Sequence, residues 1–493
     1  MAVLDPVSRN YGRLKNYVNG EWVDSASDKV LDVRNPATTD VIAQVPLSTR
    51  EETKAAIEFA DEAWWSWRET APGDRTRCFF KLKTIMEREY ENIARIISQE
   101  QGKTIDDARG ETRRCIDNID TAAGITTLQM GYNLEDGAAS NIDEEVIMSP
   151  LGVFAAVCPF NFPGMVPFWF WPYAVATGNM YIVKPSEQVP ITTQYMFKLI
   201  DQAGFPPGVI NLVNGREDAV NTFFDHKAVR GISFVGSTPV AKWIYKTAGE
   251  TGKRVQAQGG AKNSLIIMPD AVLDKTVNNM LASFYGCAGQ RCLAGSNMIA
   301  IGDVAEPLLK KWLEASKNLK VGYGLDEGSQ MGPVISGAAK QKVLGYIQKG
   351  VDEGAKLLLD GRNIKVPGYE KGHFIGPTVF DNVTPDMAIA KEEIFGPVVC
   401  FHRMKNLDEA IEFIHKSPFG NASSIYTQNG RWARDFRYKT QCGNIGINVG
   451  IAAAMAYFPF AGYKESFFGD LHGQGKDAIQ FFTDRKVVIT RWF

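Results

Sequence analysis

Short apolar runs alternate with helix-length amphipathic segments along this chain, and that pattern limits the folds open to it. The runs that predict buried strands are residues 153–157, 179–183, 209–213 and 231–235. The segments with helical spacing are residues 51–67, 77–97, 191–204 and 238–251. Buried strands separated by helix-length connections predict a parallel sheet with helices on both faces. A second alternation begins at residue 265, so the 493 residues predict an α/β protein of about three domains.

Residues 151–183 carry no charge and are long enough to imitate a membrane span, which needs ~20 apolar residues. The prolines that interrupt this segment are Pro159, Pro163, Pro167 and Pro172. Each of them would break a spanning helix. We therefore interpret the segment as a buried strand, a loop and the start of a helix, and we expect no membrane association.

The charge and cysteine content argue against other classes of function. The 54 Lys and Arg residues nearly balance the 56 Asp and Glu residues, so the chain lacks the basic field that nucleic-acid binding needs. Seven cysteines without a CxxC pair, together with five histidines, argue against a disulfide framework and against a metal site. The first residues lack a basic stretch leading into an apolar one, so we expect no signal peptide and a cytoplasmic protein.

Cys292 differs from the other cysteines in the residues around it. It follows Gly-Gln-Arg and precedes Leu-Ala-Gly within residues 284–296. Small residues leave room to expose a thiolate, and the N–H of Cys292 itself can face a bound carbonyl. The guanidinium of Arg291 would favour the thiolate. A buried apolar role is the usual alternative for an isolated cysteine, and we keep that interpretation for Cys287.

The segment around Cys292 resembles the nucleophile motif of the aldehyde dehydrogenase superfamily, and other segments resemble further motifs of that superfamily in the same order. Residues 159–163, Pro-Phe-Asn-Phe-Pro, resemble the motif with the oxyanion asparagine. Residues 184–187, Lys-Pro-Ser-Glu, are similar to the strand end that holds the adenosine ribose. Residues 234–238, Phe-Val-Gly-Ser-Thr, resemble the pyrophosphate loop. Residues 392–397, Glu-Glu-Ile-Phe-Gly-Pro, resemble the segment whose glutamate grips the nicotinamide ribose.

The resemblance covers nearly the whole chain and implies the aldehyde dehydrogenase fold. In that fold a Rossmann-like NAD-binding domain faces an α/β catalytic domain, and a small β-element serves oligomer contact. For this chain the resemblance implies an NAD-binding domain in residues 1–123 and 146–257, a catalytic domain in residues 258–461, and an oligomerisation element in residues 124–145 and 462–493. It also implies a homodimer or a homotetramer.

The residue types at these positions suit the roles that the resemblance implies. Cys292 would attack the substrate, and the side-chain amide of Asn161 would share the developing oxyanion with the N–H of Cys292. Lys184 and Glu187 can bond a ribose diol, and the carboxylate repels a 2′-phosphate, which favours NAD over NADP. The other implied cofactor-binding residues are Phe160, Gly236, Ser237, Glu393 and Phe395. The alternative for Asn161 is that it completes a proline-rich turn. The alternative for Lys184 and Glu187 is a surface ion pair.

Gln258 departs from the pattern of the superfamily's hydrolytic members. Within residues 256–263, Gln-Ala-Gln-Gly-Gly-Ala-Lys-Asn, those members have a glutamate four residues before the lysine, as general base for the deacylating water. An amide takes no proton near neutral pH, so base catalysis worth roughly 10² to 10⁴ in rate is missing there. An ionised thiol such as that of coenzyme A can attack a thioester without that base.

The chain thus resembles the coenzyme A-acylating methylmalonate-semialdehyde dehydrogenase branch, which also has Gln-Arg-Cys and an ending like residues 467–472. That branch acts on aldehydes with a carboxylate, which Arg114 and Arg291 would bind, since a guanidinium can bond a carboxylate at two places. Arg113 is a second candidate for this carboxylate-binding role. The alternative role for Arg114 is a solvated charge on a helix face. The aromatic residues that would line the substrate passage are Phe162, Trp169 and Trp171. A buried core position is the alternative for at least one of them.

The resulting hypothesis is NAD-dependent oxidation of malonate or methylmalonate semialdehyde through a thioacyl group on Cys292. Loss of carbon dioxide and transfer of the acyl group to coenzyme A would follow. Two alternatives stay open, the first of which is a hydrolytic aldehyde dehydrogenase, disfavoured by Gln258. The second is a non-catalytic protein on this scaffold, disfavoured because Cys292, Asn161 and Glu393 occur together.

Overall fold

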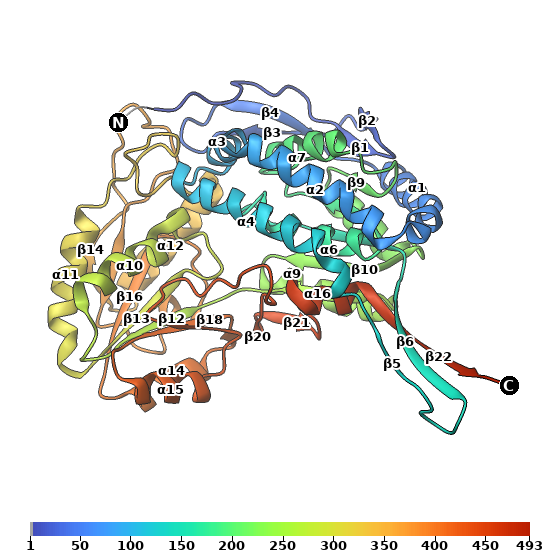
Figure 1. Cartoon of the computed structure of the whole chain (residues 1–493). Coiled ribbons are helices and arrows are strands. Elements are labelled where there is room, and N and C mark those ends of the chain that lie inside the picture. The colour runs from blue at the N-terminus through green and yellow to red at the C-terminus, as the bar shows by residue number, and fades with distance from the viewer. Residues whose placement is uncertain (1–2) are drawn as a thin grey trace.

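The computed structural model describes residues 3–493 and contains a large sheet with a parallel centre (Figure 1). Its eight strands lie in the order β2 (Glu21–Val23), β1 (Asn16–Val18), β9 (Ile210–Leu212), β8 (Met180–Lys184), β7 (Val153–Val157), β10 (Val229–Val235), β11 (Arg254–Gln258) and β21 (Phe467–Gly469). The neighbouring strands β9, β8, β7, β10 and β11 pair in parallel. On either side of them, β1 pairs antiparallel with β9 and β21 pairs antiparallel with β11. All residues of β7 and β8 are buried, as predicted for strands covered on both faces.

Helices cover this sheet. Of two long helices that the sequence predicts there, the structure confirms one and divides the other. The helix predicted over residues 51–67 is α1 (Arg50–Glu69), which packs on β7, β8 and β9. The segment predicted as one helix over residues 77–97 is two helices, α2 (Pro72–Arg88) and α3 (Tyr90–Gln101). They meet at Glu89, whose backbone leaves the helical region and whose carboxylate accepts hydrogen bonds of 2.8 Å from Asn92 and Tyr195.

The remaining helices of this half cover the sheet or its ends. They are α4 (Ile105–Ala123), α5 (Met165–Phe168), α6 (Trp171–Ala176), α7 (Pro190–Ala203), α8 (Glu217–Asp225), α9 (Thr238–Glu250) and α16 (Gly475–Phe482), with the 3₁₀ turn η1 (Ile125–Thr127). The uncharged residues 151–183 form β7, α5, α6 and β8 in the interior, the mixture that the sequence predicts. Within residues 3–493, no helix is both long enough and apolar enough to cross a membrane.

A second large sheet forms the other half of the molecule. Its seven strands lie in the order β14 (Lys356–Leu359), β15 (Thr378–Asp381), β16 (Val398–Met404), β13 (Gly295–Ile301), β12 (Asn263–Ile267), β18 (Ala422–Tyr426) and β19 (Asn444–Ile447). All neighbours pair in parallel except β14 and β15. Its helices are α10 (Leu273–Tyr285), α11 (Ala305–Lys317), α12 (Gly337–Asp352), α13 (Ala388–Lys391), α14 (Leu407–Lys416) and α15 (Gly430–Lys439), with the 3₁₀ turns η2 (Gly286–Gly289) and η3 (Gly302–Val304).

A three-stranded antiparallel sheet projects from the body and carries the C-terminus at its outer end (Figure 1). Its strands are β22 (Thr483–Arg491), β6 (Ile142–Pro150) and β5 (Tyr132–Leu134). The two-stranded sheets are β3 (Val30–Arg34) with β4 (Val41–Pro46), and β17 (Phe419–Gly420) with β20 (Tyr463–Lys464). β21 lies in residues 462–493 but pairs with β11 in the large sheet. The predicted domain boundaries themselves stay a prediction.

Candidate active site

The loop that carries Cys292 runs from η2 to β13. The backbone carbonyl of Cys292 accepts hydrogen bonds of 2.8 Å from the side-chain amides of Asn263 and Asn421. Asn263 also donates to the carbonyl of Ala294 at 2.8 Å. Asn263 begins β12 and Asn421 directly precedes β18. Neighbouring strands of the second sheet therefore fix the backbone of the candidate nucleophile.

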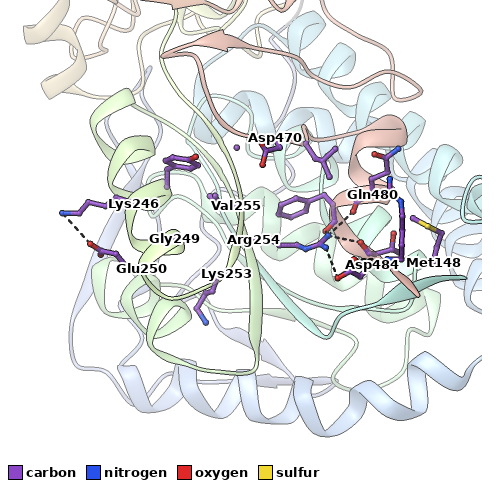
Figure 2. A pocket seen from close by; sticks show the side chains of 16 residues that line it. Met148, Lys246, Gly249, Glu250, Lys253, Arg254, Val255, Asp470, Gln480 and Asp484 are labelled. Carbon is purple, nitrogen blue, oxygen red and sulfur yellow. Dashed lines mark hydrogen bonds and ion pairs between the residues drawn. The ribbon is translucent and has the colours of Figure 1, made fainter. Parts of the chain in front are cut away.

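A cavity of ≈ 230 Å³, here called the Cys292 pocket, opens beside this loop. The predicted site residues that line it are Arg114, Phe162, Trp169, Arg291 and Cys292. A larger cavity of ≈ 930 Å³ lies between α9, β11 and β22 (Figure 2), and none of the predicted site residues lines it. We take the Cys292 pocket as the candidate active site because a nucleophile, a cation and aromatic side chains converge there.

Asn161 lies close to the nucleophile loop, as an oxyanion donor must. It is 5% exposed, and its Nδ2 donates to the backbone carbonyl of Gln290 at 3.1 Å. An amide nitrogen carries two N–H groups, so one remains to donate toward an oxygen bound beside Cys292.

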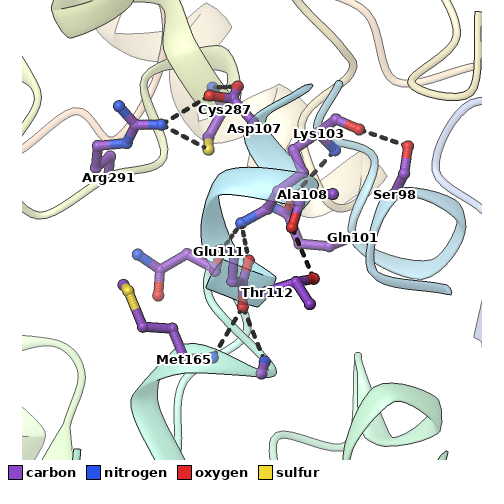
Figure 3. A network of polar contacts seen from close by, with 12 residues as sticks. Ser98, Gln101, Lys103, Asp107, Ala108, Glu111, Thr112, Met165, Cys287 and Arg291 are labelled. Atoms are coloured by element: carbon purple, nitrogen blue, oxygen red, sulfur yellow. Dashed lines mark hydrogen bonds and ion pairs between the residues drawn. The ribbon is translucent and has the colours of Figure 1, made fainter. Parts of the chain in front are cut away.

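A buried ion pair holds the backbone around Asn161 (Figure 3). Lys103 Nζ lies 2.5 Å from Glu111 Oε2, and both side chains are fully buried. Lys103 also donates to the backbone carbonyl of Asn161 at 2.8 Å. Glu111 Oε1 accepts from the backbone N–H groups of Gly164 at 2.8 Å and Met165 at 3.1 Å. The pair thereby ties both ends of residues 161–165 to the start of α4.

Asp107, one turn before Glu111 on α4, holds the other side of the nucleophile loop (Figure 3). Its carboxylate accepts from the backbone N–H of Cys287 at 3.0 Å and from the guanidinium of Arg291 at 2.9 Å. Arg291 also lies 3.4 Å from the Sγ of Cys287. Because Asp107 matches its charge, Arg291 is a weaker candidate for a substrate carboxylate than the sequence indicates.

Arg114 and Arg113 point to different surroundings. Arg114 lines the Cys292 pocket, its guanidinium contacts the Sδ of Met455, and it forms no ion pair with any residue in the range 3–493. Arg113 instead pairs with Glu87, with Nη1 2.6 Å from Oε1. Of the two adjacent arginines, the structure therefore brings Arg114 to Cys292.

The aromatic residues predicted for the substrate passage divide into wall and core. Trp169 lines the pocket and stacks on Phe460, with ring centroids 4.3 Å apart. Phe162 also lines it, beneath the Nζ of Lys103. Trp171 is fully buried and stacks on Phe79. The prediction that Trp171 lines the passage is corrected accordingly, because α6 turns this side chain into the core.

The residues predicted for the adenosine end of a dinucleotide lie at the carboxyl end of β8. Lys184 is the last residue of β8, and its Nζ lies 3.8 Å from Glu187 Oε2. Burial lowers the pKa of Lys184. Arg216 donates to Glu187 Oε1 at 2.9 Å. The carboxylate at this strand end is thus held between two cations.

Gly236 and Ser237 link β10 to α9, and this turn suits a pyrophosphate. The side chain of Ser237 makes no capping hydrogen bond, so the first N–H groups of α9 keep their capacity to bind an anion. A Cβ at Gly236 would lie 2.4 Å from the ring of Phe234, so a larger residue there would force that ring to move. The residues present therefore fit NAD at this end.

The residues predicted for the nicotinamide end lie where the two halves meet. Glu393 Oε1 accepts from the backbone N–H of Ala261 at 2.9 Å, and burial raises the pKa of Glu393 to about 7. Phe395 has a left-handed φ of 61°, and its ring meets that of Phe160 edge-to-face at 5.9 Å.

Gln258 supports the wall of the Cys292 pocket. It ends β11, and its Nε2 donates to the backbone carbonyl of Phe460 at 3.0 Å. Phe460 lines the pocket and stacks on Trp169. The Oε1 of Gln258 is buried without a hydrogen-bond partner among the residues that the structure describes.

Comparisons with known proteins agree on one family. The model of the aldehyde dehydrogenase family matches residues 22–488. The chain belongs to the aldehyde dehydrogenase family. A malonate-semialdehyde dehydrogenase of Halalkalibacterium halodurans is 46% identical to it over 480 residues, which is 97% of this chain and 98% of that protein.

Solved structures of aldehyde dehydrogenases share the fold closely. A methylmalonate-semialdehyde dehydrogenase from Oceanimonas doudoroffii has a TM-score of 0.96 and 41% identity, over 98% of each chain. A protein of Sinorhizobium meliloti 1021, assigned as a methylmalonate-semialdehyde dehydrogenase and complexed with NAD, has a TM-score of 0.96 and 42% identity, over 98% of this chain and 99% of that one. The predicted aldehyde dehydrogenase fold is confirmed.

In this aldehyde dehydrogenase the thiol of Cys292 is neutral near pH 7. Burial, and then the carboxylate of Glu393, raise the pKa of Cys292 to about 12. Arg291 acts in the opposite direction, as the sequence predicts. Burial outweighs the guanidinium, whose charge Asp107 largely matches.

The residues of this aldehyde dehydrogenase that act through the backbone are not predicted from the sequence. They are Lys103, Asp107, Glu111, Asn263 and Asn421. Each bonds a main-chain group of the site or a side chain beside it, so none lies in a motif that signals chemistry. Asn263 has a signal within reach, because it closes the segment of residues 256–263 that contains Gln258.

Proposed function

We propose that this chain oxidises a short acid semialdehyde, malonate or methylmalonate semialdehyde, with NAD and passes the acyl group to coenzyme A. The observation that carries the proposal is a pocket that holds both Cys292 and Arg114, a guanidinium without an ion-pair partner in residues 3–493. A carboxylate held by Arg114 would place the aldehyde end of a short substrate at Cys292. The malonate-semialdehyde dehydrogenase of Halalkalibacterium halodurans, at 46% identity, supports this substrate class.

Cys292 carries the covalent step. The thiol of Cys292 first gives its proton to solvent, and the Sγ of the resulting thiolate adds to the aldehyde carbon. The oxyanion that forms accepts hydrogen bonds from the Nδ2 of Asn161 and from the N–H of Cys292. NAD, when bound, supplies the hydride acceptor. Lys184, Glu187, Gly236 and Ser237 would hold its adenosine and pyrophosphate, and Phe160, Glu393 and Phe395 its nicotinamide end. Loss of the hydride from the adduct leaves a thioester on Cys292.

The choice of acyl acceptor depends on Gln258, which cannot act as a general base. Its amide takes no proton, and its Nε2 is bonded to the carbonyl of Phe460, which supports a thiol over water as the acyl acceptor. The substrate's carboxylate leaves as carbon dioxide, and the carbon beside the thioester takes up a proton. The thiolate of coenzyme A then attacks the thioester carbonyl and expels the thiolate of Cys292. The products are acetyl-CoA or propionyl-CoA.

The test is NADH formation from malonate semialdehyde with and without coenzyme A. We predict steady turnover with coenzyme A, and a burst of about one NADH per site followed by a slow phase without it. Cys292→Ala, the control, should bind NAD and form no NADH. Equal steady rates under both conditions would reject coenzyme A as the acceptor and favour hydrolysis to a free acid.

We also propose a cytoplasmic homodimer or homotetramer, with the NAD-binding, catalytic and oligomerisation regions bounded as the sequence predicts. Apolar side chains on the projecting sheet support the assembly. Those more than half exposed are Tyr132, Leu134, Val487 and Ile489. Tyr132, Val146 and Val487 lie in register across the three strands, so an apolar row crosses one face of the sheet. Exposed apolar patches are typical of subunit interfaces.

A further inference from the structure

One polar residue of the Cys292 pocket has no task in the mechanism proposed above. Gln474 is 2% exposed and lines the pocket together with Arg114 and Cys292. Its side-chain amide neither caps α16 nor bonds to any other residue in the range 3–493. The amide atoms of Gln474 are not sealed from solvent, so within residues 3–493 the side chain keeps its capacity to bond water or a ligand in the pocket.

Gln474 has a backbone conformation that is normally found only for glycine. Its φ is 68° and its ψ is 167°, a region that other residues almost never adopt. Two backbone hydrogen bonds hold Gln474 in this conformation. The N–H of Gln474 donates to the carbonyl of Trp169 at 3.3 Å, and the N–H of Gly475 donates to the carbonyl of Ala456 at 3.1 Å. Strain of this kind persists mostly at functional sites. A long amide side chain in place of glycine therefore indicates a function for that side chain.

The segment that holds Gln474 also contacts Arg114. Ala456 accepts from the N–H of Gly475, and Met455, one residue earlier, contacts the guanidinium of Arg114. The residues with charged side chains that line the pocket are Asp106, Asp107, Glu111, Arg114 and Arg291. Asp107 pairs with Arg291, Glu111 with Lys103 and Asp106 with Arg109, so Arg114 is the cation left for a ligand.

We propose that Gln474 is a specificity-determining residue whose side-chain N–H donates to the carboxylate of the acid semialdehyde bound at Arg114. The inference rests on the proposed function and names a second group of its carboxylate site. Arg114 from α4 supplies the charge, and Gln474 from the start of α16 supplies a neutral donor. The two groups would hold the carboxylate from different elements and turn the aldehyde end toward Cys292.

The test compares kcat/KM for malonate semialdehyde with kcat/KM for propanal, which has no carboxylate, in the wild type and in Gln474→Gly. We predict that the ratio of the two values falls about tenfold, because a hydrogen bond to a charged group is lost. The melting temperature should stay the same or rise, since glycine relieves the backbone strain. Gln474→Glu should lower the ratio further by repelling the carboxylate, and Arg114→Leu should also lower it.

Asn382→Gly is the matched control. Asn382 has a left-handed φ of 54° and does not line the Cys292 pocket, so this change relieves strain without touching the proposed contact. An unchanged ratio in Gln474→Gly, with the Arg114→Leu ratio lowered, would assign Gln474 a purely structural role. A wild-type enzyme with no preference for malonate semialdehyde over propanal would instead overturn the proposed function itself.

Discussion

At the scale of single residues, Cys292 lies among groups with opposing effects on its thiol. Burial and Glu393 raise its pKa to about 12, and Arg291, already paired with Asp107, only partly offsets them. Without NAD the thiolate fraction therefore rises with pH throughout the range below 12. We predict that alkylation of Cys292 by iodoacetamide becomes about tenfold faster per pH unit from about pH 6 to 9.

The measurement is mass spectrometry of the peptide that contains Cys292. Cys78 is the other cysteine with appreciable exposure. The variant Cys292→Ala is the control, because it shows the labelling of Cys78 alone. A plateau between about pH 7 and 8 would contradict the prediction, because the thiol would then ionise near neutral pH.

The sequence motifs bring the right residue types to one pocket, but they do not identify each residue's partner. Cys292 and Arg114 line one pocket, and Asn161 bonds to the loop that carries Cys292; each stands in a short segment with its own signature. The partner of Arg291 is Asp107, 184 residues earlier, and no local pattern reveals that pairing. The orientation of Trp171 is likewise decided by how α6 packs.

At the scale of elements, the start of α4 supports residues 161–165 through the buried pair of Lys103 and Glu111. Lys103→Met would leave the carboxylate of Glu111 buried without its cation, which costs about 3–5 kcal/mol. We predict a lower midpoint of urea unfolding for this variant and a lower kcat, because Asn161 loses a backbone contact.

Lys311→Met is the control for Lys103→Met, since Lys311 forms an ion pair of 2.6 Å with Asp274 on the surface. Its unfolding midpoint should stay close to that of the wild type. Similar midpoints for Lys103→Met and the wild type would show that the buried pair contributes little to stability.

Element boundaries show the same limit of sequence analysis. The apolar spacing continues across Glu89, so the sequence predicts one helix where α2 and α3 are separate. One of the bonds that fix Glu89 at the break comes from Tyr195, 106 residues away. Strands that are buried on both faces, such as β7, are predicted well because their composition alone identifies them.

At the scale of the whole molecule, the edge strand β22 of the projecting sheet exposes two apolar side chains to solvent. Val487 is 62% exposed and Ile489 is 65% exposed, and as alternate residues of β22 they share one face. We predict that the double change Val487→Lys and Ile489→Lys lowers the molar mass measured by light scattering, because charges would have to be buried between subunits. Val272→Lys, on an exposed apolar residue elsewhere, should leave the mass unchanged. A wild type that is already monomeric would contradict the prediction.

The chain passes from the large sheet to the second sheet through residues 259–262 and returns through residues 448–466. The two passages touch, since the N–H of Gly259 donates to the carbonyl of Ser466 at 2.9 Å and the Oγ of Ser466 donates to that of Gly260 at 2.7 Å. The halves are also bonded away from these passages, since the N–H of Ile105 donates to the carbonyl of Gly324 at 2.8 Å and the N–H of His373 donates to that of Pro36 at 2.9 Å. Backbone bonds therefore tie the two halves at separate places, and we expect the pocket that holds Cys292 and Arg114 to be preformed before a substrate binds.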